Sequence, residues 1–222
     1  MKTRSLPLIE KNPWIANRVR GANVLHVGCT DWPLTGDRLE RGELLHSELC
    51  KVTARCVGVD LDSEGIAKLR ELMPAHEFHV ENAETLGEAS SFVGTQWDFI
   101  VAGDVVEHMN NPGLFFDSVR KLLTPDGTLI VTVPSAFSAK RFFWLLFTGQ
   151  EQVHPDHTGY FSESTLIRIG ERNGYKVSAI YGFQWLNPTL KNRIANMMSA
   201  PFVWFSRGRC ADEVAVEFRK SA

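Results

Sequence analysis

The sequence lacks several features that mark particular classes of protein. Its longest run of large apolar residues is the six-residue stretch 142–147, whereas a helix needs about 20 apolar residues to cross a bilayer. Residues 1–14 carry charges and contain no apolar core of a secretory signal. The net charge is −2, and no basic face of the kind that binds nucleic acid is evident. We therefore expect a cytoplasmic protein that has neither a transmembrane segment nor a nucleic-acid partner.

Cysteine is also scarce, and its spacing argues against a disulfide framework. The four residues Cys29, Cys50, Cys56 and Cys210 include no CxxC pair. Cys29 and Cys56 lie in apolar runs that are typical of buried strands, so we expect reduced thiols in the core. The length of 222 residues suits one domain with a modest insertion better than two independent cores.

Short apolar runs alternate along the chain with stretches whose apolar residues recur at helical spacing. The runs predict strands at 23–28, 56–61, 77–80, 98–102, 128–133, 176–183 and 213–218. Helices are expected at 38–51 and after the capping residues Asp62, Asn111 and Ser162, and 124–127 is expected as a turn. This alternation favours an α/β fold with a parallel sheet covered on both faces. Such a sheet binds ligands at the carboxyl ends of its strands.

We interpret residues 1–222 as a single domain with three additions to its core. Residues 1–20 are expected as an N-terminal extension, 137–160 as a lid-like insertion rich in aromatic residues and histidine, and 187–206 as an apolar helical insertion. The apolar surface of these insertions favours a lid packed on the core, or a homodimer interface. The alternative is a groove for an acyl or polyprenyl chain, or a contact with a membrane surface.

Residues suited to a nucleotide-like ligand follow four consecutive strands. Gly28 lets a ligand approach the backbone closely. Asp60 can accept two hydrogen bonds from a ribose diol, and because Asp62 is better placed to cap the next helix, we favour ligand binding for Asp60. Asn82 can read the edge of a purine or belong to an exposed turn, and Gly103 precedes polar residues. Together these positions predict a site for a nucleoside with a charged tail.

The same segments resemble the successive motifs of class I S-adenosylmethionine-dependent methyltransferases. The resemblance covers residues 22–182 through VLHVGCT, GVDLD, ENAE, the long block from Asp98 to Ser135, and FSESTLIRIGERNGYKV. More narrowly, the chain is similar to bacterial small-molecule methyltransferases, including some of polysaccharide or lipid-linked sugar synthesis. The resemblance implies a Rossmann-like, doubly wound, mostly parallel seven-stranded sheet, and we expect its last strand to run antiparallel between its neighbours.

Carried over by position, the resemblance implies that S-adenosyl-L-methionine is the cofactor and that it lies along the strand ends. The methionine part would lie against the first loop and the residues after the fourth strand, the ribose against Asp60, and the adenine edge against Asn82. The implied cofactor-binding residues are His26, Gly28, Cys29, Asp60, Leu61, Asn82, Ala83, Gly103, Asp104 and Val105. Glu107 and His108 would line the floor near the transferred methyl group.

The first loop departs from the family pattern. Members usually carry two or three glycines there, whereas this chain has only Gly28 in the segment Gly28-Cys29-Thr30-Asp31-Trp32-Pro33. Either the loop follows another path or cofactor binding is weakened. We favour another path because Asp60 and the later motifs are intact.

Three histidines are candidates for catalysis. Methyl transfer is an in-line displacement that gains from holding both groups in line, and a hydroxyl acceptor also gains from a base. His108, His154 and His157 can supply that base, although each can instead be a loop residue bonded to the backbone. A metal site from His154, Asp156 and His157 is an alternative, but its spacing is not diagnostic, and we predict no metal.

The sequence therefore predicts methyl transfer to a small-molecule acceptor, with a lipid- or sugar-linked acceptor as one possibility. One alternative is a catalytically inactive, methyltransferase-like binding subunit, which the glycine-poor loop supports. The other is a nicotinamide-dependent oxidoreductase, which shares the sheet and the acid after the second strand. Against it, no GxGxxG follows the first strand and no YxxxK pair occurs.

Overall fold

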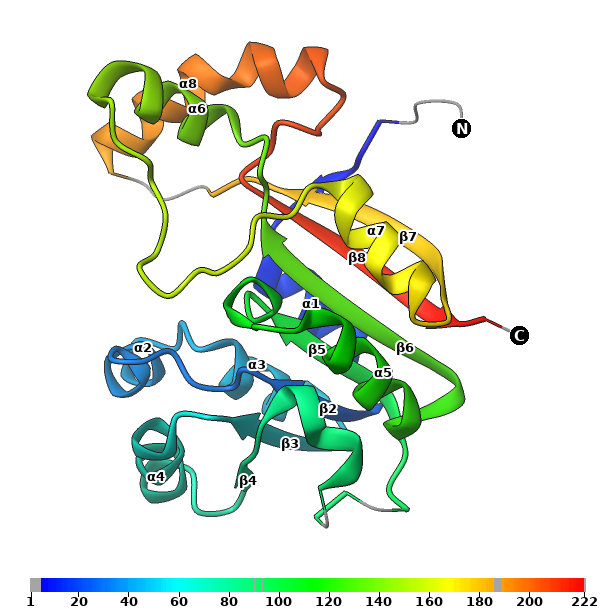
Figure 1. The fold of residues 1–222 in the computed structure, drawn as a ribbon. Coiled ribbons are helices and arrows are strands. Elements are labelled where there is room, and N and C mark those ends of the chain that lie inside the picture. The colour runs from blue at the N-terminus through cyan, green and yellow to red at the C-terminus, as the bar shows by residue number, and fades with distance from the viewer. Residues whose placement is uncertain (1–4, 90, 93, 186–188, 222) are drawn as a thin grey trace.

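The computed structural model describes residues 5–89, 91–92, 94–185 and 189–221. The expected N-terminal extension and the expected insertion at 187–206 lie partly outside the described residues, at 1–4 and at 187–188. Within the described part, strands and helices alternate as a layered α/β structure, with one pair of helices at the end remote from β4 (Figure 1).

Among the residues described, eight strands form one sheet in the order β1-β7-β8-β6-β5-β2-β3-β4. Neighbouring strands are parallel except β8, which is antiparallel to both β6 and β7. The antiparallel last strand confirms the prediction, but the sheet has eight strands rather than seven because Leu8 and Ile9 pair with the edge strand β7. The strands are β1 (Leu8–Ile9), β2 (Asn23–Val27), β3 (Arg55–Asp60), β4 (Glu77–Val80), β5 (Trp97–Gly103), β6 (Leu123–Pro134), β7 (Tyr175–Phe183) and β8 (Glu213–Lys220).

Helices cover both faces of the sheet, as the alternation of strand residues requires. Leu25 and Val27 of β2 belong to the core under α5 and α7, whereas Val24 faces the core under α1 and α3. The α-helices are α1 (Lys11–Arg18), α2 (Thr35–Glu40), α3 (Leu45–Val52), α4 (Ser63–Leu72), α5 (Pro112–Leu122), α6 (Ala139–Thr148), α7 (Glu163–Arg172) and α8 (Leu190–Phe205), and the short 3₁₀ helices are η1 (Ala83–Glu88) and η2 (Val106–His108).

Capping residues place several helices where the sequence predicts them. The side chain of Asp62 accepts a hydrogen bond from the Gly65 amide at the start of α4. Ser162 and Thr165 form a reciprocal capping box at the start of α7. Asn111 occupies the cap position of α5 without a side-chain cap bond. The predicted caps at Asp62 and Ser162 are therefore confirmed. Asn111 holds the predicted cap position, but the capping hydrogen bond expected from its side chain is absent.

Two predicted boundaries are wrong for local reasons. The helix expected at 38–51 is two helices, α2 and α3, because Gly42 adopts a left-handed conformation with φ of 69° that interrupts the helical path. The turn expected at 124–127 lies inside β6, where the register against β5 jumps between Trp97 and Phe99. The turn residues are thus accommodated as an irregularity of a continuous strand.

Candidate active site

A cavity of about 1250 Å³ opens at the carboxyl ends of β2, β3, β4 and β5. Chain order reverses between β2 and β5, which are neighbours in the sheet although β3 and β4 intervene in sequence. This is the place at which an open parallel sheet binds its ligand. Of the residues predicted from the sequence, those that line the cavity are Gly28, Asp60, Leu61, Asn82, Ala83, Gly103, Asp104, Val105, Glu107, His108, His154 and His157.

The first loop turns sharply at Gly28. Its φ is 76°, and a β-carbon there would lie 2.1 Å from Cγ2 of Val105. The amides of Gly28 and Cys29 both donate to the carbonyl of Val59, at 2.9 and 3.2 Å. One glycine is therefore enough for this loop, because its backbone is held against β3 and packed against Val105.

Asp60 at the end of β3 holds the same loop from the other side. Its Oδ2 accepts hydrogen bonds from the backbone amide of Thr30 at 3.0 Å and from the Thr30 hydroxyl at 2.8 Å. Its Oδ1 accepts from the Asp62 amide at 3.1 Å. Each carboxylate oxygen has two lone pairs. Oδ2 already accepts two hydrogen bonds, so it is Oδ1 that keeps acceptor capacity while Asp60 fixes the loop path.

The residues expected to contact adenine, Asn82 and Ala83, lie at the start of η1. The Asn82 Oδ1 accepts from the Glu84 amide at 2.9 Å and so caps this short helix. Its side-chain NH₂ group is not used by that bond. Leu61, which follows β3, is 66% exposed and adds an apolar side chain to the lining of the cavity.

An ion-pair network missed by the sequence analysis lies at the end of β5. Lys11 of α1 donates a hydrogen bond to Asp104, and its Nζ lies 2.9 Å from Oε2 of Glu213 on β8. Asp104 has a left-handed backbone with φ of 55° and also accepts from the Thr132 hydroxyl at 3.0 Å. Burial alone would lower the pKa of Lys11, but the two carboxylates outweigh it and raise the pKa. The N-terminal helix therefore reaches into the site.

Glu107 has an unusual carboxyl group. The residue is 1% exposed, lines the cavity, and neither of its carboxyl oxygens has a hydrogen-bond partner. Burial, reinforced by the negative charge of Asp104, raises its pKa to about 9. The carboxyl group is therefore protonated and uncharged at neutral pH.

The three candidate histidines come together beside Glu107. Each of the three imidazole rings has a nitrogen that faces the other two, and these three nitrogens, from His108, His154 and His157, all lie within 4.8 Å of one another. Burial and the neighbouring His108 lower the pKa of His157 to about 4, and burial with the nearby His154 also lowers the pKa of His108. Nε2 of His157 lies 4.0 Å from Oε1 of Glu107. The structure thus places side chains 46 residues apart in sequence in one group at the cavity wall.

The expected lid-like insertion supplies the part of the wall that carries His154 and His157. Arg141 and Trp144 of α6 line the cavity, as do all residues from 150 to 157. Thr158 anchors the end of this segment through hydrogen bonds. Its amide donates to the Glu107 carbonyl, and its hydroxyl lies within hydrogen-bond distance of the carbonyls of both Glu107 and Met109.

Two residues predicted to bind the cofactor lie away from the cavity. His26 points to the α3 face of the sheet, where its Nδ1 lies 3.1 Å from that of His46, and Cys29 is fully buried. For His26 the reason is strand alternation, since its neighbours Leu25 and Val27 face the other side. Neither His26 nor Cys29 presents its side chain to the cavity, so only their backbone atoms could contact a ligand there.

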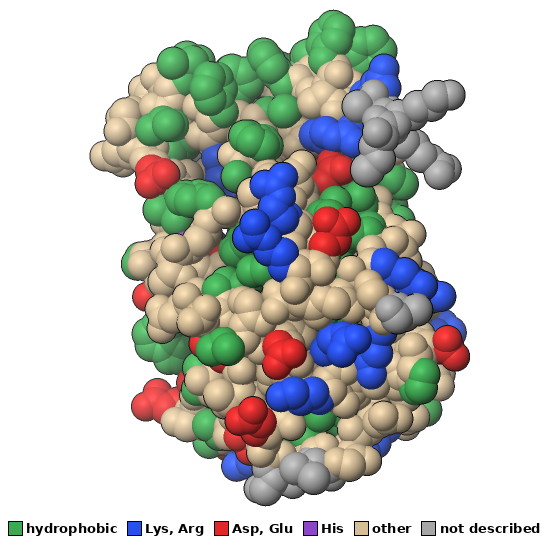
Figure 2. Space-filling model, turned by 45° about the vertical axis from the view of Figure 1, so that its right-hand side comes forward, with side chains coloured by type: hydrophobic (Ala, Val, Ile, Leu, Met, Phe, Trp, Pro, Cys, Tyr) green, Lys and Arg blue, Asp and Glu red, His purple; other side chains and the backbone are tan. Residues whose placement is uncertain are grey.

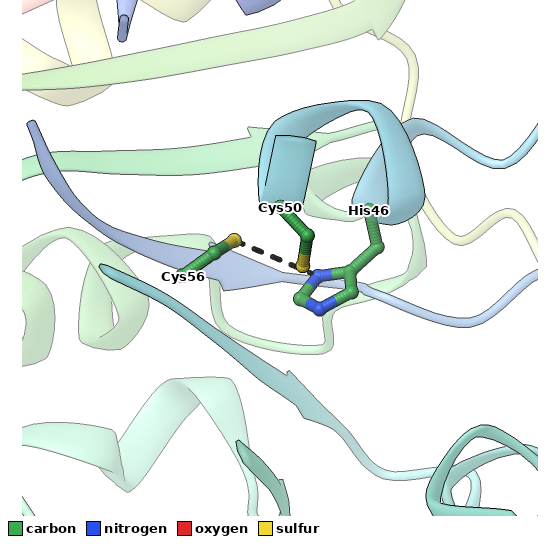
Figure 3. Close-up of side chains that lie close together, drawn as sticks. All are labelled: His46, Cys50 and Cys56. Carbon is green, nitrogen blue, oxygen red and sulfur yellow. Dashed lines mark hydrogen bonds between the residues drawn. The ribbon is translucent and has the colours of Figure 1, made fainter. Parts of the chain in front are cut away.

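A second cluster lies in the same buried layer as His26. Figure 3 shows His46 and Cys50 of α3 facing Cys56 of β3, with Sγ of Cys56 3.9 Å from Nδ1 of His46. All four cysteines are free thiols, in agreement with the expected reduced core. The Cys56 thiol and the His46 ring hydrogen-bond to Cys50 and hold its pKa below the usual range. The cluster packs α3 on the sheet and is separate from the cavity.

A family model described as a methyltransferase domain matches residues 9–180. The chain belongs to this family. An Aeromonas salmonicida protein named ubiquinone biosynthesis O-methyltransferase is 22% identical over 195 residues, which cover 81% of this chain and 76% of that protein. The human mitochondrial protein of that name is 26% identical over 177 residues, or 76% of this chain and 45% of its own length. The chain thus spans less than half of some relatives.

Solved structures of S-adenosylmethionine-dependent methyltransferases share the fold. A protein from Archaeoglobus fulgidus superimposes with a TM-score of 0.61 at 16% identity, covering 95% of both chains. The N-methyltransferase NodS of Bradyrhizobium japonicum, solved with S-adenosylhomocysteine, gives 0.57 at 14% identity, covering 94% of this chain and 85% of its own. The predicted fold and family are confirmed, and the nicotinamide-dependent alternative is set aside.

The residues of the cavity fit S-adenosylmethionine, the cofactor of this family. The fit rests on the chemistry of the groups at the strand ends. Asp60 offers Oδ1 as an acceptor where a hydroxyl of the ribose is expected, and Gly28 keeps the loop clear of a side chain. The amide of Asn82 and the apolar side chain of Leu61 suit an adenine edge and face. A cavity of about 1250 Å³ also leaves room for an acceptor.

Proposed function

We propose that the chain transfers the methyl group of S-adenosylmethionine to a hydroxyl oxygen of a small, lipid- or sugar-linked acceptor, with His157 as the general base. The names of its relatives support oxygen as the methylated atom. We also propose that it acts in the cytoplasm, which the four free thiols support because a reducing compartment keeps them so.

The observation that carries the proposal is the group of three imidazoles on the cavity wall. Their lowered pKa values keep His157 and His108 neutral near pH 7, so each has a ring nitrogen with a free lone pair that can accept a proton, although as a weaker base than an ordinary imidazole. A hydroxyl acceptor needs such a base, whereas a neutral amine is already nucleophilic. The chemistry of this wall therefore favours O-methylation.

The cofactor supplies a methyl group that a positively charged sulfur activates for displacement. The residues of the chain then have two tasks. The walls formed by residues 150–157 and by the strand ends hold the acceptor in line. His157 takes the hydroxyl proton on a ring nitrogen as the acceptor oxygen attacks. Glu107, which is neutral at pH 7, adds no negative charge that would oppose formation of the oxyanion.

The test is a series of phenols whose hydroxyl pKa decreases, with S-adenosylhomocysteine release as the readout. We expect His157→Ala to lower kcat by about 10² to 10⁴ for weakly acidic phenols, and by less as the phenol ionises by itself. His76→Ala, an exposed histidine outside the cavity, is the control and should leave kcat unchanged. An equal loss for every phenol, or methylation of anilines only, would refute the role of His157 as a base.

Binding of S-adenosylhomocysteine separates this enzyme from an inactive binding subunit. Gly28 and Asp60 shape a loop path that does not need the missing glycines. Calorimetry should therefore show S-adenosylhomocysteine binding well below millimolar concentration. Absence of binding at that concentration would instead favour the inactive subunit.

A further inference from the structure

Helices α6 and α8 form a cap whose outer surface is mostly apolar. The rings of Phe143 and Phe202 pack at a centroid distance of 4.9 Å and join the two helices. Eleven of the 22 exposed large hydrophobic side chains of the described residues lie on these 26 helical residues. They are Phe142, Leu145, Leu146, Phe147, Leu190, Ile194, Met197, Met198, Phe202, Trp204 and Phe205. Figure 2 shows hydrophobic side chains gathered at this end of the molecule.

The exposure of these side chains is large, and it is concentrated on the cap. Phe147, Trp204 and Phe205 are 69%, 74% and 76% exposed. Scattered exposed apolar residues are normal, but a contiguous group with several aromatic members marks an interaction surface. Such a surface favours an interaction partner, and the charges that flank it indicate the chemistry of that partner.

All charges in this part of the sequence have one sign. Residues 139–148 and 190–209 contain no Asp or Glu, although the whole chain has a net charge of −2. Their basic residues are Lys140, Arg141, Lys191, Arg193, Arg207 and Arg209. Lys140 pairs with Asp212 and Arg209 with Glu163, whereas Arg193 is exposed on α8. An apolar, aromatic surface with basic flanks is complementary to an anionic bilayer surface.

A second copy of the chain fits this surface less well. In a symmetric dimer the same patch meets itself, so the basic residues of both copies would be brought together. Neither helix carries an acid to pair with them. Within the described residues, no helix is long and apolar enough to span a membrane, and α8 has only 16 residues. The observations favour a cap that lies on a bilayer rather than one that crosses it.

The cap also adjoins the active site. Arg141 and Trp144 on the inner side of α6 line the main cavity. Together with Gln152 and Trp185 they also line a smaller cavity of about 290 Å³ that reaches Asn192 of α8. The match to the family model ends at residue 180, before α8 begins. Helix α8 therefore lies outside the matched residues and packs, through Phe202, against the helix that lines the cavity.

We propose that the α6–α8 cap docks on an anionic phospholipid surface and presents the cavity entrance to an acceptor held there. The docking is independent of the chemistry of methyl transfer, while the delivery of an acceptor rests on the proposed function.

Co-sedimentation of the full chain with vesicles tests the docking. One set contains phosphatidylcholine with about 30% phosphatidylglycerol, and the other phosphatidylcholine alone, a difference in surface charge that basic residues sense. We expect strong binding to the anionic vesicles and weaker binding to the neutral ones. The double variant Trp204→Ser/Phe205→Ser should bind anionic vesicles at least about tenfold more weakly, because it removes two aromatic side chains from the buried interface.

Matched measurements keep the outcome decisive. Leu114→Ser removes an apolar side chain that is 50% exposed on α5 and should bind like the wild type. S-adenosylhomocysteine affinity should be unchanged in the double variant, which verifies its fold. Absence of vesicle binding by the wild type would overturn the proposal, and so would a wild-type dimer that the double variant dissociates. If methyl transfer fails with every acceptor while vesicle binding persists, only the proposed function is lost.

Discussion

The carboxylate of Asp60 accepts hydrogen bonds from Thr30 of the first loop, and we expect it to accept one from the ribose as well. Asp60→Ala should weaken S-adenosylhomocysteine binding by about a hundredfold, the effect of a net loss of about 3 kcal/mol in charge-assisted hydrogen bonds. It should also lower the melting temperature, because Thr30 and the Asp62 amide lose their acceptor. Calorimetry and thermal unfolding on the same variant measure both effects.

Two neighbours serve as controls for Asp60. Thr30→Val removes only the hydroxyl that donates to Asp60, and we expect less than about a tenfold loss of affinity, the effect of about 1.4 kcal/mol. Asp62→Ala removes the cap of α4 and should cost about 1 kcal/mol of stability with nearly normal affinity. Near-normal affinity in Asp60→Ala would show that this residue is a loop anchor alone.

The buried carboxyl of Glu107 gives stability a specific pH dependence. Its pKa is raised in the folded state to about 9, so the folded protein binds this proton more tightly than the unfolded chain. Its contribution to stability is therefore full below the unfolded pKa of about 4.3 and is lost as pH rises toward 9. We expect Glu107→Gln to be more stable than the wild type at pH 8.5 by at least about 1.4 kcal/mol, the equivalent of one pKa unit.

Urea unfolding of Glu107→Gln and the wild type at pH 5.5 and 8.5 measures this difference. The advantage of the variant should shrink at pH 5.5, where the wild-type carboxyl is already neutral. The neighbouring acids Asp104 and Glu213 are present in both proteins, so the substitution changes only the group at position 107. The same advantage at both pH values would contradict a neutral Glu107.

The residues of the site differ in how far sequence could predict them. Residues at the carboxyl ends of strands, such as Asp60 of β3 and Gly103 of β5, lie where the parallel arrangement of the strands places them. His26 was misplaced although its signal was present, since alternation with Leu25 and Val27 turns it to the other face. Lys11 had no local signal, because its partner Asp104 is 93 residues away in sequence.

At the scale of elements, the segment between α6 and α7 combines an end held by hydrogen bonds with an exposed middle. Thr158 is anchored to the carbonyls of Glu107 and Met109, whereas residues 150–153 are exposed beside the cavity. We expect amide hydrogen exchange at 150–157 to slow when S-adenosylhomocysteine binds, since closure over the ligand would exclude water. Exchange in α4, outside this wall, should stay unchanged. No protection at 150–157 despite measured binding would argue against a lid.

Element boundaries were predictable where a side chain acts locally and not where tertiary packing decides. Asp62, Ser162 and Gly174 start or end helices through caps or a left-handed residue, all visible in sequence. The break at Gly42 was missed because leucines continue at helical spacing on both sides of it. The strand β6 includes residues 124–127 because Leu123 pairs with Trp97 of β5. A contact between residues this far apart cannot be predicted from the local sequence pattern.

At the scale of the whole molecule, the N-terminal segment joins three parts of the fold. Its β1 extends the sheet at β7, its α1 covers the face that carries α3, and Lys11 reaches Asp104 and Glu213 in the site. The sequence predicts an N-terminal extension over residues 1–20. Ile15 and Val19 of this segment are fully buried, so it also contributes to the core.

This integration predicts a large effect from a single substitution far from the cavity in sequence. Ile15→Ala should lower the free energy of unfolding by about 2–5 kcal/mol, since it leaves a void among packed side chains of α1, α3 and the sheet. Leu8→Ala, at a site that is 48% exposed on β1, should change it by less than about 0.5 kcal/mol. Urea unfolding of both variants measures the difference. If Ile15→Ala behaves like Leu8→Ala, α1 is a detachable extension, and the position of Lys11 in the site has no support from the core beneath it.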